Sequence, residues 1–160
     1  MSLKTYTFLK QKTTFPIALL LCLLANCGDP EYRMRPLGWA NVSEVEWTKQ
    51  FDDFEIRTRG MGGLSGQWWV DPDLQIHNNK KAIALESASL FAGEKKFSGE
   101  VYRNESIPPS ETGYHLPVKW NFNREQTAAK VLGNHCTIVL DLKVNGDSRQ
   151  ITIEYEKLMR

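Results

Sequence analysis

The sequence predicts an all-β protein, an antiparallel β-sandwich of about seven strands with one or two short helical segments. Two observations carry this prediction. Residues 136–144 and 147–155 alternate between apolar and polar side chains and are joined by Asn145-Gly146, the dipeptide that most favours a two-residue hairpin turn because both residues accept positive φ. From residue 54 onward, turn-forming residues recur about every 8–12 residues, which is typical of a sandwich.

The two-residue turn also fixes the register of the C-terminal hairpin. It places three pairs on one apolar face: Leu140 with Ile151, Ile138 with Ile153, and Cys136 with Tyr155. The other face is mostly polar, so the hairpin must lay its apolar side on a second layer of structure.

The N-terminus has the layout of a secretory signal. Lys4, Lys10 and Lys12 precede an apolar run over residues 15–25, and no acidic residue interrupts them. This run is shorter than the roughly 20 residues that a membrane-spanning helix needs. We expect residues 1–26 to be a signal peptide.

The end of that run, Leu24-Ala25-Asn26-Cys27, resembles the lipobox of bacterial lipoproteins. The resemblance implies that Cys27 is diacylated, becomes the mature N-terminus and anchors the protein to a membrane of a bacterial cell envelope. Gly28 after the cysteine implies the outer membrane where the cell has two. Asn26 stands where Gly, Ala or Ser is usual. The alternative is ordinary signal cleavage before Gly28, which would release a soluble periplasmic or secreted protein.

Removal of residues 1–26 leaves 134 of the 160 residues, enough for one domain. Three of the 20 basic residues and none of the 19 acidic ones lie in the leader. The remaining 17 basic and 19 acidic residues leave no positive excess for nucleic-acid binding. With Cys27 acylated, Cys136 is the one thiol left, so we expect no internal disulfide.

We expect residues 27–42 to form a tether and residues 43–160 the β-sandwich domain. The tether contains Asp29-Pro30 and Arg35-Pro36 and lacks an apolar period. At the start of the domain, the capping-box pattern Ser43-Glu44-Val45-Glu46 and the spacing of Trp47, Phe51 and Phe54 predict a short helix. Val45 and Trp47 also alternate as in a strand, so the competing prediction is an early edge strand.

The middle of the chain is expected to supply most of the remaining strands. A strand over 54–59 is followed by a glycine-rich stretch, 60–66, which we expect to be a mobile inter-strand loop. A strand over 67–77 is broken at Pro72 and ends in a turn at 78–80.

The next strands continue this pattern. The run 82–91 is apolar on both parities, as in a strand covered on both faces. Further strands follow at 97–102 and 116–122, separated by the proline-stiffened loop 107–113. In the second of these, four alternating residues should face inward: Leu116, Val118, Trp120 and Phe122. Residues 123–132 predict a helical turn capped by Asn123 and ended by Gly133.

Three segments carry a further resemblance, which spans residues 54–155. They are Leu74-Gln-Ile-His-Asn-Asn79, Ile107-Pro-Pro-Ser-Glu111 before Leu116-Pro-Val-Lys-Trp120, and the closing Ile151-Thr-Ile-Glu-Tyr155. Their pattern resembles the immunoglobulin-like sandwiches of small bacterial lipoproteins and of water-stress type domains. The antibody hallmarks are absent, since no cysteine pair can cross the sheets. The resemblance implies an accessory or binding role without an active site.

No catalytic residue, metal site or cofactor is predicted. His135 and Cys136 are neighbours in a strand, so their side chains point to opposite faces and cannot share an ion or form a nucleophile–base pair. Cys136 shares the apolar parity of the hairpin, which predicts a buried thiol. Asp71-Pro72-Asp73 does not continue as a calcium loop, because Ile76 replaces the required glycine. We therefore expect a protein that is not an enzyme.

Trp68-Trp69 is the candidate binding surface. Consecutive strand residues face opposite sides, so when one ring fills the core the other lies on the outer face or beneath the glycine-rich stretch. An exposed indole could bind a sugar ring or anchor a partner, so the expected partners are an envelope protein or a glycan. The alternative is that the aromatic segment 42–54 covers the outer ring.

Overall fold

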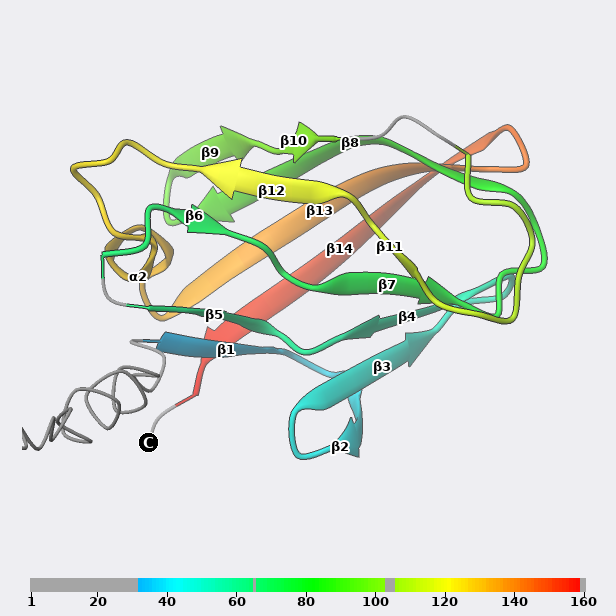
Figure 1. The fold of residues 1–160 in the computed structure, drawn as a ribbon, viewed down its shortest axis with the longest axis horizontal. Helices are drawn as coiled ribbons and strands as arrows, with labels where there is room; N and C mark the ends of the chain where they lie inside the picture. Colours follow the sequence, from blue (N-terminus) through cyan, green and yellow to red (C-terminus); the bar gives the residue numbers. More distant parts are fainter. Residues whose placement is uncertain (1–31, 65, 103–105, 159–160) are drawn as a thin grey trace, which may run out of the picture.

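The computed structural model describes residues 32–64, 66–102 and 106–158, and in them the chain forms an antiparallel all-β sandwich (Figure 1). The predicted fold class, an antiparallel all-β sandwich, is confirmed, but the described residues form fourteen strands rather than the predicted seven or so. The expected signal peptide, 1–26, and the lipidation site Cys27 lie outside the described residues. Within the described ranges, no helix is long and apolar enough to cross a membrane.

The first layer is a six-stranded sheet built around the predicted hairpin. Its order is β5 (Met61–Gly63), β1 (Tyr32–Pro36), β14 (Asp147–Lys157), β13 (His135–Val144), β8 (Ile83–Ala92) and β9 (Lys95–Ser98). The predicted register of β13 and β14 is confirmed, with Ile138 opposite Ile153. Asn145 and Gly146 have φ values of 53° and 95°, as this turn requires.

A β-bulge in β8 explains why both parities of that strand are apolar. Asp141 of β13 pairs with Ser87, but the next residue, Leu142, pairs with Leu85, so Glu86 is an extra residue without a partner. Before the bulge Ile83 and Leu85 are buried, and after it the parity changes to three other buried residues: Ala88, Leu90 and Ala92. The prediction that β8 is covered on both faces is therefore wrong, because the bulge turns both apolar sets to the same side.

The predicted tether, 27–42, is wrong for its described part. Residues 32–36 form β1, which pairs with β14 on one side and β5 on the other. Its alternating side chains Tyr32, Met34 and Pro36 are buried. The sandwich therefore includes the chain from Tyr32 onward, and the predicted domain start at residue 43 is wrong. Pro30 and Pro36 had favoured a tether, and the alternating run of β1, which includes Pro36, is only five residues long.

The glycine-rich stretch also forms part of the sheet. Met61–Gly63 is the edge strand β5, so the prediction of a mobile loop over 60–66 is wrong for these residues. Gly60, with φ of 77°, comes so close to β1 that a Cβ there would lie 2.2 Å from the carbonyl oxygen of Met34. The glycines permit this close approach of two backbones.

The second layer consists of a five-stranded and a three-stranded sheet. The five-stranded sheet has the order β11 (Tyr114–His115), β7 (Leu74–His77), β4 (Glu55–Thr58), β3 (Glu46–Gln50) and β2 (Ala40–Ser43). The three-stranded sheet has the order β10 (Glu100–Val101), β12 (Val118–Asn121) and β6 (Trp69–Val70).

The two sheets of the second layer are connected by one strand pairing that is interrupted in the middle. β6 and β7 form one strand broken at Pro72, as predicted, and β11 and β12 form its partner, broken at Pro117. The same register runs through both halves, with His115 opposite Gln75 and Asn121 opposite Trp69. Proline cannot donate a ladder hydrogen bond, so the ladder loses its regular pairing there but keeps its register.

The predicted helix over 43–54 is wrong, and the competing prediction of an early edge strand is confirmed. Residues 40–50 form the hairpin β2–β3, and β3 pairs with β4. The hydroxyl of Ser43 accepts a hydrogen bond from the amide of Val45 at 3.4 Å within this tight turn. Trp47 and Phe54 are buried from this extended chain, so tertiary packing overrode the helical spacing.

The core lies between the layers and is closed at one end by the helix α2 (Ala128–Leu132). All four residues predicted to face inward from 116–122 are buried. Thr127, rather than the predicted Asn123, occupies the N-cap position of α2, while Gly133 ends the helix with φ of 61° as predicted. The side chain of Asn123 instead accepts a hydrogen bond from the amide of Glu125 at 3.3 Å.

Candidate functional site

The two adjacent tryptophans lie near the end of the sandwich that α2 closes (Figure 1). Trp69 follows the outward parity of β6, opposite the exposed Asn121, and its side chain is 41% exposed. Trp68 is half-buried, and the guanidinium carbon of Arg124 lies 5.1 Å from its ring centroid. Val70, not a tryptophan, fills the core at this point. Neither of the two rings therefore fills the core.

The aromatic segment 42–54 does not cover these rings. It forms β2 and β3, which β4 separates from the broken strand β6/β7. Trp47 of β3 is itself buried in the core. The alternative in which this segment hides the outer tryptophan is therefore wrong, and Trp69 presents its indole on the surface.

The side chain of Gln67 fixes the turn that precedes the tryptophans. Its Oε1 accepts a hydrogen bond from the amide of Leu64 at 3.1 Å, and its Nε2 donates to the carbonyl of Trp69 at 2.8 Å. Its backbone carbonyl accepts from the amide of Ala128 at the start of α2 at 2.7 Å. Leu64, which is 54% exposed, is thus held near the tryptophans. We name Leu64, Trp68, Trp69 and Arg124 the tryptophan surface.

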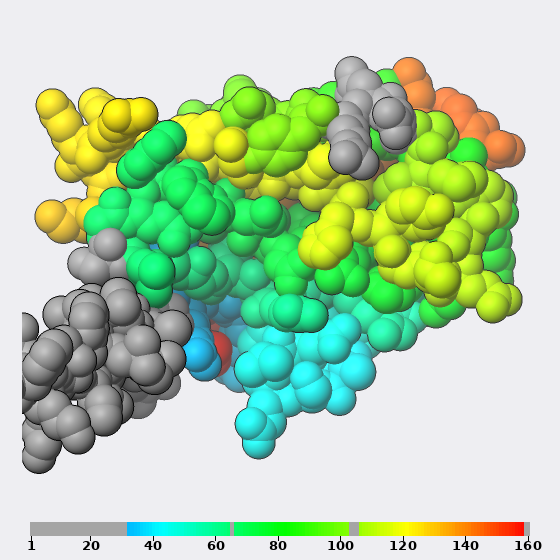
Figure 2. Space-filling view, in the orientation of Figure 1, coloured from blue at the N-terminus to red at the C-terminus, as the bar shows by residue number. Residues whose placement is uncertain are grey.

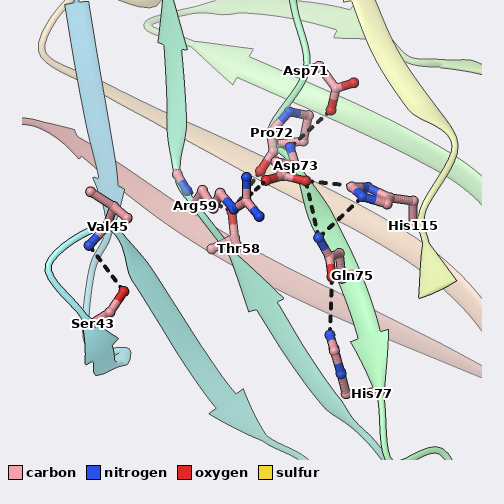
Figure 3. Close-up of polar contacts among 11 residues, drawn as sticks. Ser43, Val45, Thr58, Arg59, Asp71, Pro72, Asp73, Gln75, His77 and His115 are labelled. Atoms are coloured by element: carbon pink, nitrogen blue, oxygen red, sulfur yellow. Dashed lines mark hydrogen bonds and ion pairs between the residues drawn. The ribbon is translucent and has the colours of Figure 1, made fainter. Parts of the chain in front are cut away.

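A polar network, which sequence reasoning missed, lies on the outer face of β4, β7 and β11 (Figure 3). Nδ1 of His115 lies 3.3 Å from a carboxylate oxygen of Asp73, and Arg59 approaches the other oxygen at 3.5 Å. Gln75 donates through Nε2 to Nε2 of His115 at 3.2 Å, and its Oε1 accepts from Nε2 of His77 at 3.2 Å. The outward parity of Gln75, His77 and His115 was visible in the sequence, but the pairing of β7 with β11 was not.

Burial and neighbouring groups shift the pKa of His77 in this network and of Glu55 beside it. Burial, followed by the positive charge of Arg57, lowers the pKa of His77. Burial raises the pKa of Glu55, but hydrogen bonds from Arg57, Thr48 and Asn78 outweigh it and hold that pKa below its ordinary value. The side chains of the network make hydrogen bonds and ion pairs with one another. These contacts connect β4, β7 and β11 on the outer face of the second layer.

Cys136 is a buried core thiol, as predicted. Its sulfur lies 3.9 Å from the sulfur of Met34, and burial raises the pKa of the thiol to about 12. His135 is exposed on the opposite face of β13. In the part of the chain that the structure describes, no group of three or more His, Cys, Asp or Glu side chains could hold a metal ion.

A shallow groove of about 230 Å³ lies between the β1–β5 edge and the tip of the β2–β3 hairpin. Its floor is apolar, from Met34, Trp47 and Met61, and Arg33, Glu44 and Arg59 are among its charged lining.

These features define the class of the protein, an antiparallel β-sandwich with an indole presented near one end. No protein-family model, curated protein or solved structure matches the chain.

Proposed function

We propose that this protein is an exported lipoprotein, anchored through Cys27 to a bacterial envelope membrane, whose β-sandwich acts as a non-catalytic structural or interaction module. One observation carries the proposal. A leader with the layout of a secretory signal ends in Leu24-Ala25-Asn26-Cys27, and the first strand of the sandwich starts at Tyr32, shortly after the cysteine.

Labelling with radioactive palmitate tests the anchor. The wild-type protein should take the label and partition into detergent, because each buried methylene contributes about 0.8 kcal/mol and two or more chains make attachment stable. Cys27→Ala should abolish the label. Cys136→Ala is the matched control and should keep it, because that thiol is buried in the core. A wild-type protein that takes no label and runs free of membranes would show that the proposal is wrong.

The second candidate is a soluble periplasmic or secreted glycan-binding protein or inhibitor. The exposed indole of Trp69 beside the polar Asn121 supports it, since such a ring can stack on a sugar. Trp69→Ala should then abolish retention on isolated cell-wall polysaccharide and leave the melting temperature nearly unchanged, because the ring lies on the surface. Equal retention of wild type and variant would contradict this candidate.

A further inference from the structure

We propose that the tryptophan surface rests on the lipid bilayer, and that the opposite end of the sandwich, with the turn at Asn145-Gly146, points away from it. The inference builds on the proposed lipid anchor at Cys27 and adds an orientation and a second contact with the membrane. It would make the protein a module that stands on its membrane in one fixed direction.

The length of chain between the anchor and the sandwich carries the first step. Only residues 28–31 separate Cys27 from Tyr32, the first residue of β1. Five Cα–Cα steps span at most about 18 Å, at roughly 3.3–3.6 Å per residue. About 5–8 Å of this lies within the lipid headgroups. Tyr32 therefore stands at most about 10–13 Å above the membrane surface, whereas a strand as long as β14, with 11 residues, extends about 36 Å.

The second step is that the tryptophan surface lies at the same end as Tyr32. Tyr32 pairs with Gly63, so Leu64, the next residue after Gly63, lies beside the start of β1. Trp68 accepts a backbone hydrogen bond from Phe122 at 2.7 Å, which brings the turn containing Arg124 to the same end. Figure 2 shows the 66–70 and 123–127 segments side by side on the left of the molecule. In Figure 1 the β13–β14 turn lies at the opposite end.

The third step is that these side chains suit a membrane interface. Tryptophan is enriched at the headgroup level because its ring is apolar and its N–H is polar. Leu64 offers an apolar side chain that is 54% exposed, and the guanidinium of Arg124 can pair with lipid phosphates. Lys130 of α2 and the nearby Lys95 add positive charges at this end, and Glu125 and Glu94 line the same hollow, so Arg124 leaves a small positive excess there.

An environment-sensitive fluorophore at each end tests the orientation. The lipidated protein is purified from membranes and reconstituted in vesicles of phosphatidylethanolamine and phosphatidylglycerol. Leu64→Cys carries the dye NBD at the tryptophan surface, and Glu111→Cys, in the loop at the opposite end, is the matched control. Both native residues are exposed, so melting temperatures close to that of the wild type verify the fold. The wild-type protein is the labelling blank, because the Cys136 thiol is buried.

The dye at position 64 should shift to shorter wavelength on reconstitution and lose at least half its emission to doxyl-labelled lipids. The dye at position 111 should change in neither respect. Equal quenching of the two dyes, or stronger quenching at position 111, would show that the orientation is wrong. If the same protein still incorporates palmitate and associates with vesicles, the proposed anchor stands. A protein without palmitate that remains in solution would instead show that the proposed function is wrong.

Discussion

At the residue scale, two glycines with similar backbone conformations face different surroundings. Gly60 and Gly93 have φ values of 77° and 59°, which are strained for any residue with a Cβ. A Cβ at Gly93 would meet no atom within 4 Å, whereas one at Gly60 would lie 2.2 Å from the carbonyl oxygen of Met34. The backbone of β1 would therefore have to move to accommodate a side chain at Gly60.

Gly93→Ala should cost about 1 kcal/mol, from backbone strain alone. Gly60→Ala should cost about 3–5 kcal/mol, because overpacking is added to the same strain. Urea denaturation of the two variants and the wild type measures both values. Equal losses of unfolding free energy would mean that β5 does not pack on β1 as closely as the structure shows.

At the same scale, the sequence predicted some positions and not others for identifiable reasons. Cys136 and Ile138 could be placed in the core because the Asn145-Gly146 turn fixes which residues share a face. For the pair Trp68-Trp69, the alternation could place one ring on an outer face or beneath the glycine-rich stretch but could not say which, and the exposure of that ring depends on whether a distant segment covers it. That depends on the arrangement of the strands, which no local pattern encodes.

At the element scale, the bulge at Glu86 determines which face of β8 is buried. Glu86 is exposed and its carboxylate forms an ion pair with Lys143, also largely exposed. The side chain of Glu86 therefore contributes little to stability, but its backbone changes the parity of the strand between Leu85 and Ala88. The bulge accommodates one residue that the ladder does not need, and so keeps the apolar residues before and after it on the same face.

Glu86→Ala should change the unfolding free energy by no more than about 0.5 kcal/mol. Deletion of Glu86 should also change the unfolding free energy by no more than about 1 kcal/mol, because Leu85 and Ser87 then become neighbours opposite Leu142 and Asp141. The apolar residues on both sides of the junction stay on the buried face. Thermal and chemical denaturation of the two variants provide the comparison. A deletion variant that loses several kcal/mol, as expected when a one-residue shift turns Ile83 and Leu85 to the solvent face, would contradict the assigned bulge.

Local sequence patterns gave wrong predictions where tertiary packing determined the secondary structure. Residues 43–54 carry a capping box and helical spacing, yet Trp47 is buried from a strand that pairs with β4. In β8, apolar residues at both odd and even positions suggested that both faces are covered. The hydrophobic pattern alone does not reveal a bulge. The long hairpin and the break at Pro72 were predictable, since turn residues and proline act through their own backbone.

At the scale of the whole molecule, Asp53 joins the two layers. It lies between β3 and β4 of the second layer, and its carboxylate binds Arg149 of β14 in the first layer at 3.0 Å. The ammonium of Lys81, just before β8, lies 3.2 Å from the same carboxylate. No sequence motif identifies this contact, because its partners come from three separate parts of the chain.

Asp53→Asn should lower the unfolding free energy by about 1–2 kcal/mol, since a largely buried carboxylate loses two cationic partners and leaves them unpaired. The neighbouring Asp52 is exposed, so Asp52→Asn is a matched control and should change stability by no more than about 0.5 kcal/mol. Because salt screens charges that solvent reaches, the gap between the two variants should narrow in 1 M sodium chloride. A double-mutant cycle with Arg149→Gln isolates the contact between the layers. If Asp53→Asn and Asp52→Asn have the same melting temperature, or the cycle gives a coupling free energy of zero, then Asp53 does not hold the two layers to each other.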